Sequence, residues 1–218
     1  MPRELITLTE ASNYLKLSKK IVTDMIDQGV FSQFPKGKTF RVDKNEINEW
    51  LSNLSESQNE QLALRRTACR FMDYFSTDFI MLDFKVDNKY EAIGEMSKLA
   101  KDVKLVRNQR WLYEVVVARE ELISTAIGNG VALLHPRRLH PSKIKSPSIL
   151  FGRSTHGVDF DSPDNKPVNL FFMLLLHNDK QHLFSLSYIS KFLSNSDNLQ
   201  LLLDSTDKKE IFDKLTAV

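Results

Sequence analysis

Cysteine is nearly absent from this chain, and its single residue, Cys69, has no partner for a disulfide within the chain. Chains without internal disulfides are typical of a reducing compartment, so we expect a cytoplasmic protein. The first ten residues lack the apolar core of a signal peptide, and the apolar stretch at residues 170–176 is too short to span a bilayer. We therefore expect neither export nor insertion into a membrane.

An excess of one charge is also missing: 30 Lys and Arg stand against 28 Asp and Glu, a net charge of +2. This balance neither favours nor excludes a nucleic-acid partner. Metal-ligand spacing is absent too, because His135, His140 and Cys69 form no HxxxH, HExxH or CxxC pattern. We expect no metal and no cofactor, and structural or solvated roles for His140, His156 and His177.

What the chain does have is length and apolar content. Its 218 residues, 42% of them hydrophobic, are enough for a sizeable core and a small second domain. We predict a head at residues 1–54, a segment at 55–66 that is a linker or the exposed start of a helix, and a large domain at 67–218. Apolar spacing becomes helical at 62–75, which indicates a connecting or a dimerising helix.

Residues 118–138 place a histidine at the end of a short apolar run. Residues 131–134 read as a buried strand, bounded by Gly128-Asn129-Gly130 and by Pro136. His135 follows that strand directly. Imidazole has an unperturbed pKa near neutrality, so it is available as an unprotonated nucleophile. The alternative is a surface histidine that only ends a strand.

This segment resembles the active-site region of phosphotransferase-system enzyme IIA domains of the mannitol, fructose and nitrogen-regulatory type. In those domains the histidine accepts a phosphoryl group from the phosphocarrier protein HPr. The resemblance covers about residues 67–218 and implies an α/β fold, a mixed sheet flanked by helices. The matching residues are Arg119, Glu120, Glu121, Leu122, Thr125, Gly128, Gly130, Ala132, His135, Gly152, Arg153, Gly157, Val158, Asp159, Phe160, Lys166, Pro167, Val168, His182 and Leu183.

Two further residues complete the predicted active site. Phosphoryl transfer needs positioned donors that neutralise the phosphate oxygens, and the planar fork of Arg119 suits that task. His182, near the start of a predicted helix, is placed to donate a hydrogen bond to the same oxygens and to orient His135. The alternative for Arg119 is a salt bridge with Glu120 or Glu121 on a helix surface.

The segment departs from the family on both sides of the histidine. The family usually has proline before it and glycine after it, whereas this chain has Leu134 and Pro136. Proline has no N–H to donate to a phosphate oxygen. Arg137 and Arg138 follow, either as electrostatic substitutes or as solvated charges.

Outside this site, the large domain alternates between strands and helices, as expected for α/β layering. Strands are predicted at 79–86, 131–134, 148–152 and 168–176. Helices are predicted at 88–102, 109–124, 182–194, 198–205 and 208–215.

The head has the spacing of two short helices joined by a tight turn, followed by a small wing and a closing helix. Thr9 and Ser18 are the predicted N-caps of the first two helices, and Gly29 stands where a left-handed cap ends the second. Asp43 is the predicted cap of the closing helix.

Over residues 5–53 this pattern resembles the excisionase/MerR-like winged helix-turn-helix family. The matching residues are Leu8, Glu10, Ala11, Tyr14, Leu15, Ser18, Val22, Ile26, Gly29, Gly37, Arg41, Ile47, Trp50 and Leu51. In such folds the second helix enters the major groove of DNA. The resemblance implies DNA contacts from that helix and from the wing, namely Lys19, Lys20, Thr23, Lys36, Lys38 and Arg41.

The charge of the head leaves an alternative open. Asp24 stands where the family often has a basic residue, and residues 1–54 hold eight Lys and Arg against seven Asp and Glu. A carboxylate aimed at phosphates repels them. The head is therefore either a DNA reader, which would favour a homodimer on paired half-sites, or a protein-interaction or dimerisation module.

Together these readings predict a cytoplasmic regulator that accepts a phosphoryl group from HPr on His135 and couples it to a DNA-binding head. It is a phosphoryl carrier if the histidine is active. The competing interpretation is an unphosphorylated docking module or a dimeric adaptor that does not bind DNA. No sequence feature identifies the DNA target or a downstream enzyme IIB.

Overall fold

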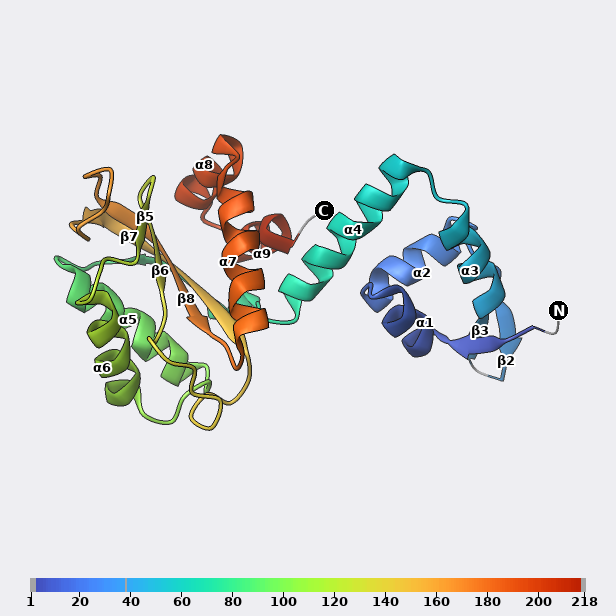
Figure 1. The fold of residues 1–218 in the computed structure, drawn as a ribbon, viewed down its shortest axis with the longest axis horizontal. Coiled ribbons are helices and arrows are strands. Elements are labelled where there is room, and N and C mark those ends of the chain that lie inside the picture. The colour runs from blue at the N-terminus through green and yellow to red at the C-terminus, as the bar shows by residue number, and fades with distance from the viewer. Residues whose placement is uncertain (1–2, 38, 217–218) are drawn as a thin grey trace. The chain divides into compact units, whose positions relative to one another are not determined.

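The computed structural model describes residues 3–37 and 39–216 (Figure 1). Two compact units form within it: Met1–Arg70 with Thr216–Val218, and Phe71–Leu215. Each unit is described by itself below. No helix of the described residues is long and apolar enough to cross a membrane.

The first unit is a small three-stranded antiparallel sheet with helices. Its core contains Ala11, Leu15, Val22 and Ile47, each fully buried. The strands run in the order β1-β3-β2. The elements are β1 (Leu5–Thr7), α1 (Leu8–Leu15), α2 (Lys19–Asp27), β2 (Phe34–Lys36), β3 (Thr39–Asp43) and α3 (Lys44–Ser52).

Capping residues set the helix boundaries of this unit. The predicted cap Thr9 was wrong: α1 starts from Thr7, whose hydroxyl accepts from the Glu10 amide at 3.0 Å while the Glu10 carboxyl accepts from the Thr7 amide at 2.7 Å. This reciprocal pair satisfies two free helix donors, and Thr9 then lies in the first turn. Ser18 caps α2 and Asp43 caps α3, as predicted.

Helix α4 (Glu56–Met72) occupies most of the segment at 55–66, for which a linker or the exposed start of a helix was predicted. The structure shows why it is helical: Ser55 Oγ accepts from the Gln58 amide at 3.3 Å, and the Gln58 side chain accepts from the Ser55 amide at 2.9 Å. Ser-x-x-Gln is a capping-box pattern, which the polar composition of this stretch concealed. The units divide at Arg70 and Phe71 rather than at residue 67.

The second unit has the predicted α/β fold, a five-stranded mixed sheet in the order β4-β7-β8-β6-β5. Parallel pairs join β4 to β7 and β6 to β8, and antiparallel pairs join β7 to β8 and β5 to β6. Its strands are β4 (Ile80–Phe84), β5 (Ala126–Gly128), β6 (Val131–Leu134), β7 (Ser148–Val158) and β8 (Val168–Leu175). Its helices are η1 (Thr77–Phe79), α5 (Lys89–Asp102), α6 (Gln109–Glu120), α7 (Asp179–Leu193), α8 (Ser196–Asp204) and α9 (Lys208–Thr216).

Helices cover both faces of this sheet, α5 and α6 on one and α7, α8 and α9 on the other (Figure 1). Successive residues of a strand point to opposite faces. Accordingly Leu134 packs in the cluster with Met96 and Leu112, whereas Leu133 packs in the cluster with Ile189 and Leu202. Burial on both faces explains why β6 is uniformly apolar.

Several elements of this unit differ from the predictions, and among them α7 begins at Asp179 rather than at His182. Strand β7 extends to Val158 instead of ending at Gly152, and the short strand β5 was not predicted. Helix α6 ends at Glu120 rather than at Ser124.

Candidate functional site

His135 directly follows strand β6, which lies between β8 and the edge strand β5. Leu134, the last residue of β6, is fully buried and aligned with Met173 of the parallel strand β8. The backbone before the histidine is therefore fixed by the sheet. The imidazole itself is half-buried.

Hydrogen bonds define which nitrogen of His135 carries the proton and which carries the lone pair. Its Nδ1 lies 2.8 Å from the carbonyl oxygen of Leu133, so Nδ1–H donates to that oxygen. Nε2 lies 3.3 Å from Nε of Arg119, which donates to it. This pair of contacts assigns the proton to Nδ1 and the lone pair to Nε2, so Nε2 is the nucleophilic atom.

Arg119, in the last turn of α6, is held in place from two directions. Besides its contact with His135, its Nη1 donates to the carbonyl oxygen of Ile123 at 2.7 Å. Within the part of the chain that the structure describes, neither Glu120 nor Glu121 forms an ion pair with Arg119, so the alternative salt bridge is absent there. The guanidinium charge is available to an anion beside Nε2.

His182 lies in the first turns of α7, opposite His135. The side chain of Asn178 caps this helix by accepting from the Gln181 amide at 3.0 Å, which starts α7 three residues before His182. The ring centroids of His135 and His182 are 4.9 Å apart, with an interplanar angle of 57°. The structure thus brings together all three residues that the sequence assigned to the active site.

Burial keeps both rings neutral at physiological pH. Desolvation lowers the pKa of His135 to about 4, against an opposing contribution from its hydrogen bond to Leu133. The nearby His182 and Arg119 lower it further. Burial also lowers the pKa of His182. A neutral ring with an unprotonated Nε2 is what a nucleophilic imidazole requires.

The space beside the two rings restricts where an acceptor reaction can take place. A hollow lined by Pro136, Arg138, Leu176 and other residues of the site has a volume of about 10 Å³. That is at most the size of one water molecule and too small for a phosphoryl group. The hollow itself therefore has no room for a phosphoryl group beside the rings.

Pro136, where the family usually has glycine, lies at this hollow. Pro136 is buried and offers no N–H, and Arg137 and Arg138 are exposed. Exposed apolar side chains lie next in sequence to the site: Leu122 is 58% exposed, Ile123 70% and Leu183 66%. Ile123 is the residue whose carbonyl holds Arg119, and Leu183 follows His182 directly.

The other histidines lie outside this constellation. His140 packs edge-on against Trp111, with ring centroids 5.1 Å apart, and His177 Nε2 lies 2.9 Å from the Ile144 carbonyl oxygen. His156 is exposed on β7. No group of three or more metal-ligating side chains is found among the described residues.

In the first unit, the predicted DNA-contact residues differ in exposure. Lys19 and Lys20 are exposed at the start of α2, and Lys36 is exposed in β2. The Thr23 hydroxyl donates to the Lys19 carbonyl at 2.8 Å, and Arg41 is half-buried with Nη1 3.9 Å from a Glu10 carboxyl oxygen. Lys38 lies outside the described residues.

Comparison with known proteins assigns the family. The profile described as "Phosphoenolpyruvate-dependent sugar phosphotransferase system, EIIA 2" matches residues 73–218. The chain belongs to this family. A second profile, described as "Helix-turn-helix domain", matches residues 5–55. The protein therefore joins an EIIA unit to a helix-turn-helix head, the composition of a phosphotransferase-system regulator.

Individual relatives agree with this assignment. The nitrogen regulatory protein of Bradyrhizobium diazoefficiens is 34% identical over 145 residues, which cover 66% of this chain and 92% of that protein. The crystal structure of nitrogen regulatory protein IIA-Ntr from Neisseria meningitidis matches with a TM-score of 0.58 and 31% identity, covering 65% of this chain and 95% of that one. IIA mannitol from Escherichia coli, at 20% identity over 64% of this chain and 97% of its own, shares the fold with a TM-score of 0.57.

Two polar residues of the EIIA unit support the fold rather than the site, and Arg153 is the first. It is buried and donates through Nη1 to the carbonyl oxygens of Leu202, Leu203 and Ser205, while its Nε and Nη2 contact Asp83. Sequence reasoning did not single out this role, because a buried arginine and an exposed one look alike in sequence.

Asp164, the second, holds the turn between β5 and β6 by accepting from the Asn129 amide at 2.8 Å. Hydrogen bonds from Ser162 and from that amide lower the pKa of Asp164 to about 2. Its carboxylate therefore stays charged, and the turn before β6 stays fixed, over the physiological pH range.

Proposed function

We propose that this protein accepts a phosphoryl group on Nε2 of His135 from an HPr-like phosphocarrier. The observation that carries the proposal is the pair of contacts on one ring: Leu133 fixes the proton on Nδ1, and Arg119 donates to the unprotonated Nε2. Family membership supports the same reaction, because the matching family is described as a phosphotransferase-system EIIA component.

The reaction is a transfer between two histidines. As the N–P bond of the donor's phosphohistidine breaks, the Nε2 lone pair of His135 forms a new N–P bond, and the donor's electron pair returns to its own ring. His135 is neutral beforehand, so no proton has to leave Nε2. The protein contributes position and positive charge, which is most of what phosphoryl transfer needs.

Arg119 and His182 take the supporting roles. The Arg119 guanidinium neutralises the oxygens of the transferred phosphoryl group next to Nε2 of His135. His182 also lies beside His135, with 4.9 Å between the centroids of the two rings. Pro136 supplies no amide to this phosphate, so Arg137 and Arg138 are the nearest substitute cations in sequence.

Exposed Leu122, Ile123 and Leu183 favour a protein as the phosphoryl donor. Exposed apolar side chains beside a polar centre are typical of protein–protein interaction sites. A small-molecule donor would instead require an enclosed pocket, and the hollow at the rings holds only about 10 Å³.

We further propose that the head binds DNA and that phosphorylation, by adding negative charge at the EIIA surface, alters DNA or partner binding in the cytoplasm. Exposed Lys19 and Lys20 at the start of α2 support the first part, because the N-terminal residues of a recognition helix approach the groove. The competing function is a docking module in which His135 is never modified.

Incubation with phosphorylated HPr separates these two functions. We expect an acid-labile, base-stable phosphate on the wild-type protein and none on His135→Ala, whereas His156→Ala, an exposed histidine on β7, retains it. Wild-type protein that stays unphosphorylated while still binding HPr would favour the docking function. For the head, absence of DNA affinity even at low ionic strength would remove DNA from the proposal.

A further inference from the structure

A strongly basic surface surrounds the loop between α5 and α6 in the EIIA unit. Residues 101–110 and 137–145 hold eight Lys and Arg but only one Asp, although the whole chain has a net charge of +2. We call "the basic surface" the six cations that line its hollows: Lys101, Lys104, Arg107, Arg110, Lys143 and Lys145.

Backbone contacts hold the two segments of this surface side by side. Val106 and Ile144 form an antiparallel bridge, and the Lys145 amide donates to the Leu105 carbonyl oxygen at 2.9 Å. Lys143 Nζ lies 4.7 Å from the centroid of the Trp111 ring. Cations from two separate stretches of the sequence thus share one surface, whose shape is fixed by the fold.

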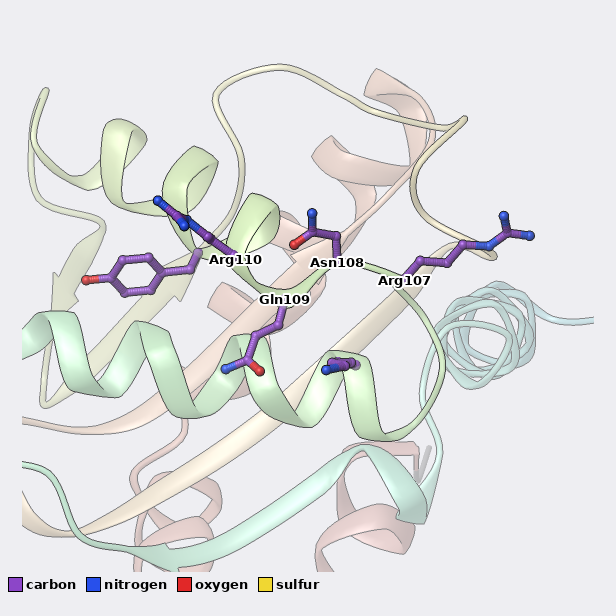
Figure 2. Close-up of a pocket in the computed structure, with 6 residues that line it drawn as sticks. Arg107, Asn108, Gln109 and Arg110 are labelled. Atoms are coloured by element: carbon purple, nitrogen blue, oxygen red, sulfur yellow. The ribbon is translucent and has the colours of Figure 1, made fainter.

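Two hollows shape the basic surface. One has a volume of about 560 Å³ and the other about 570 Å³, and both are lined by Arg107 and Asn108. No Asp or Glu is among the described residues that line either one. Figure 2 shows Arg107 and Arg110 extending away from one another at the start of α6, with Asn108 and Gln109 between them. Positive charge is therefore spread along the surface instead of being focused on one point.

The composition of this surface favours DNA over a protein partner. Protein interfaces are depleted of charge at their centre and enriched in aromatic residues. The two hollows are lined by six cations and by two aromatic residues, Trp111 and Tyr113, so charge dominates their lining. The highly exposed apolar side chains Leu122, Ile123 and Leu183 line neither hollow. Protein–DNA interfaces are polar and strongly positive, which is what the basic surface offers.

We infer that the basic surface binds the phosphate backbone of double-stranded DNA. This goes beyond the function proposed above, because it assigns a DNA contact to the EIIA unit itself. The head alone has eight Lys and Arg against seven Asp and Glu, so it attracts a polyanion only weakly. The basic surface adds charge that reads no sequence but increases affinity for any duplex.

The salt dependence of DNA binding by the full chain tests this inference. Lys101→Gln, Arg107→Gln and Lys145→Gln are combined, because all three side chains are exposed and the fold does not depend on them. The plot of log affinity against log salt has a negative slope, whose magnitude falls by roughly 0.9 for each phosphate that the protein no longer neutralises. For the triple variant on a random duplex we therefore expect the magnitude of the slope to fall by about 2 to 3. The matched control combines Lys191→Gln, Lys208→Gln and Lys209→Gln, exposed on α7 and α9, and leaves the slope unchanged.

A head variant, Lys19→Ala with Lys20→Ala, distinguishes this inference from the proposed role of the head. A smaller slope in the basic-surface variant, whether or not the head variant also has one, supports the inference. A smaller slope in the head variant alone overturns it and leaves the role of the head standing. Binding of polyglutamate but of no DNA duplex by the full chain also overturns the inference. That result would indicate that the partner of the basic surface is an acidic protein.

Discussion

Nε of Arg119 lies 3.3 Å from Nε2 of His135, and this contact joins the last turn of α6 to the end of β6. The arginine donates to the lone pair of Nε2 without protonating it, because the imidazole is neutral and Nδ1 carries its proton. A single contact therefore places a permanent positive charge beside the unprotonated Nε2.

Replacing Arg119 by lysine is expected to slow phosphoryl acceptance from phosphorylated HPr by roughly 100-fold. Lysine keeps the charge but lacks the planar fork that contacts both Nε2 and the Ile123 carbonyl. The measurement is the initial rate of phosphate incorporation. Arg110→Lys is the matched control on the same helix, because Arg110 is exposed and forms its ion pair with Glu114. Equal rates for the two variants would contradict the role given to Arg119.

The depressed pKa of His135 predicts how stability depends on pH. The folded pKa is about 4 and an unfolded histidine has a pKa near 6.5, so the unfolded chain binds more protons between these values. The contribution of neutral His135 to the free energy of unfolding is fully present above about pH 6.5 and is lost as the pH falls toward 4. Solvent screening limits this loss to roughly 1–3 kcal/mol.

Urea unfolding of wild-type protein and His135→Gln at a series of pH values measures this contribution. The free energy of unfolding of the variant is expected to decrease less over that pH window. Parallel curves for the two proteins would show that the pKa of His135 is not depressed in the folded state. Because His182 lies beside His135, with ring centroids 4.9 Å apart, the same comparison is repeated in a His182→Gln background, where His182 cannot contribute to the difference.

Pro136 offers a test of the missing amide. Both Pro136→Gly and Pro136→Ala restore an N–H next to His135, and a charge-assisted hydrogen bond to phosphate is expected to prolong the phosphohistidine about tenfold. The half-life of the phosphorylated protein is the measurement. A gain in Pro136→Gly alone would assign the effect to backbone freedom, and no gain in either would show that this position does not contact the phosphate.

The sequence predicted the large-scale organisation well, because motifs and apolar periodicity are local signals. Strand β6 and the caps Ser18 and Asp43 were predicted correctly for that reason. The start of helix α4 was left open between a linker and an exposed helix, because polar residues on an exposed helix carry no apolar period. In the site, motifs identified His135, Arg119 and His182, but the distances between these side chains could not be predicted from the sequence.

The residues that sequence reasoning missed are those whose partners are backbone atoms. The carbonyls of Leu133 and Ile123 orient the site, yet any residue type has a carbonyl, so no sequence pattern indicates them. The sequence offers Glu120 only as a possible partner of Arg119. In the structure it is buried at 2% exposure and accepts from the Thr125 amide at 2.8 Å and from the Thr125 hydroxyl at 2.5 Å.

Glu120 therefore fixes the loop that carries Ile123, and its removal is expected to loosen the arginine. Glu120→Ala leaves the Thr125 amide and hydroxyl without their partner in a buried setting, which is expected to destabilise the protein by roughly 2–4 kcal/mol. Glu121→Ala, at an exposed neighbouring position, should cost well under about 1 kcal/mol. Urea unfolding of the two variants measures the difference, and Thr125→Val in the Glu120→Ala background gives the coupling energy between the pair. Additive effects of the two substitutions would show that the hydrogen bond from the Thr125 hydroxyl to Glu120 does not stabilise the loop, since Thr125→Val keeps the bond from the Thr125 amide.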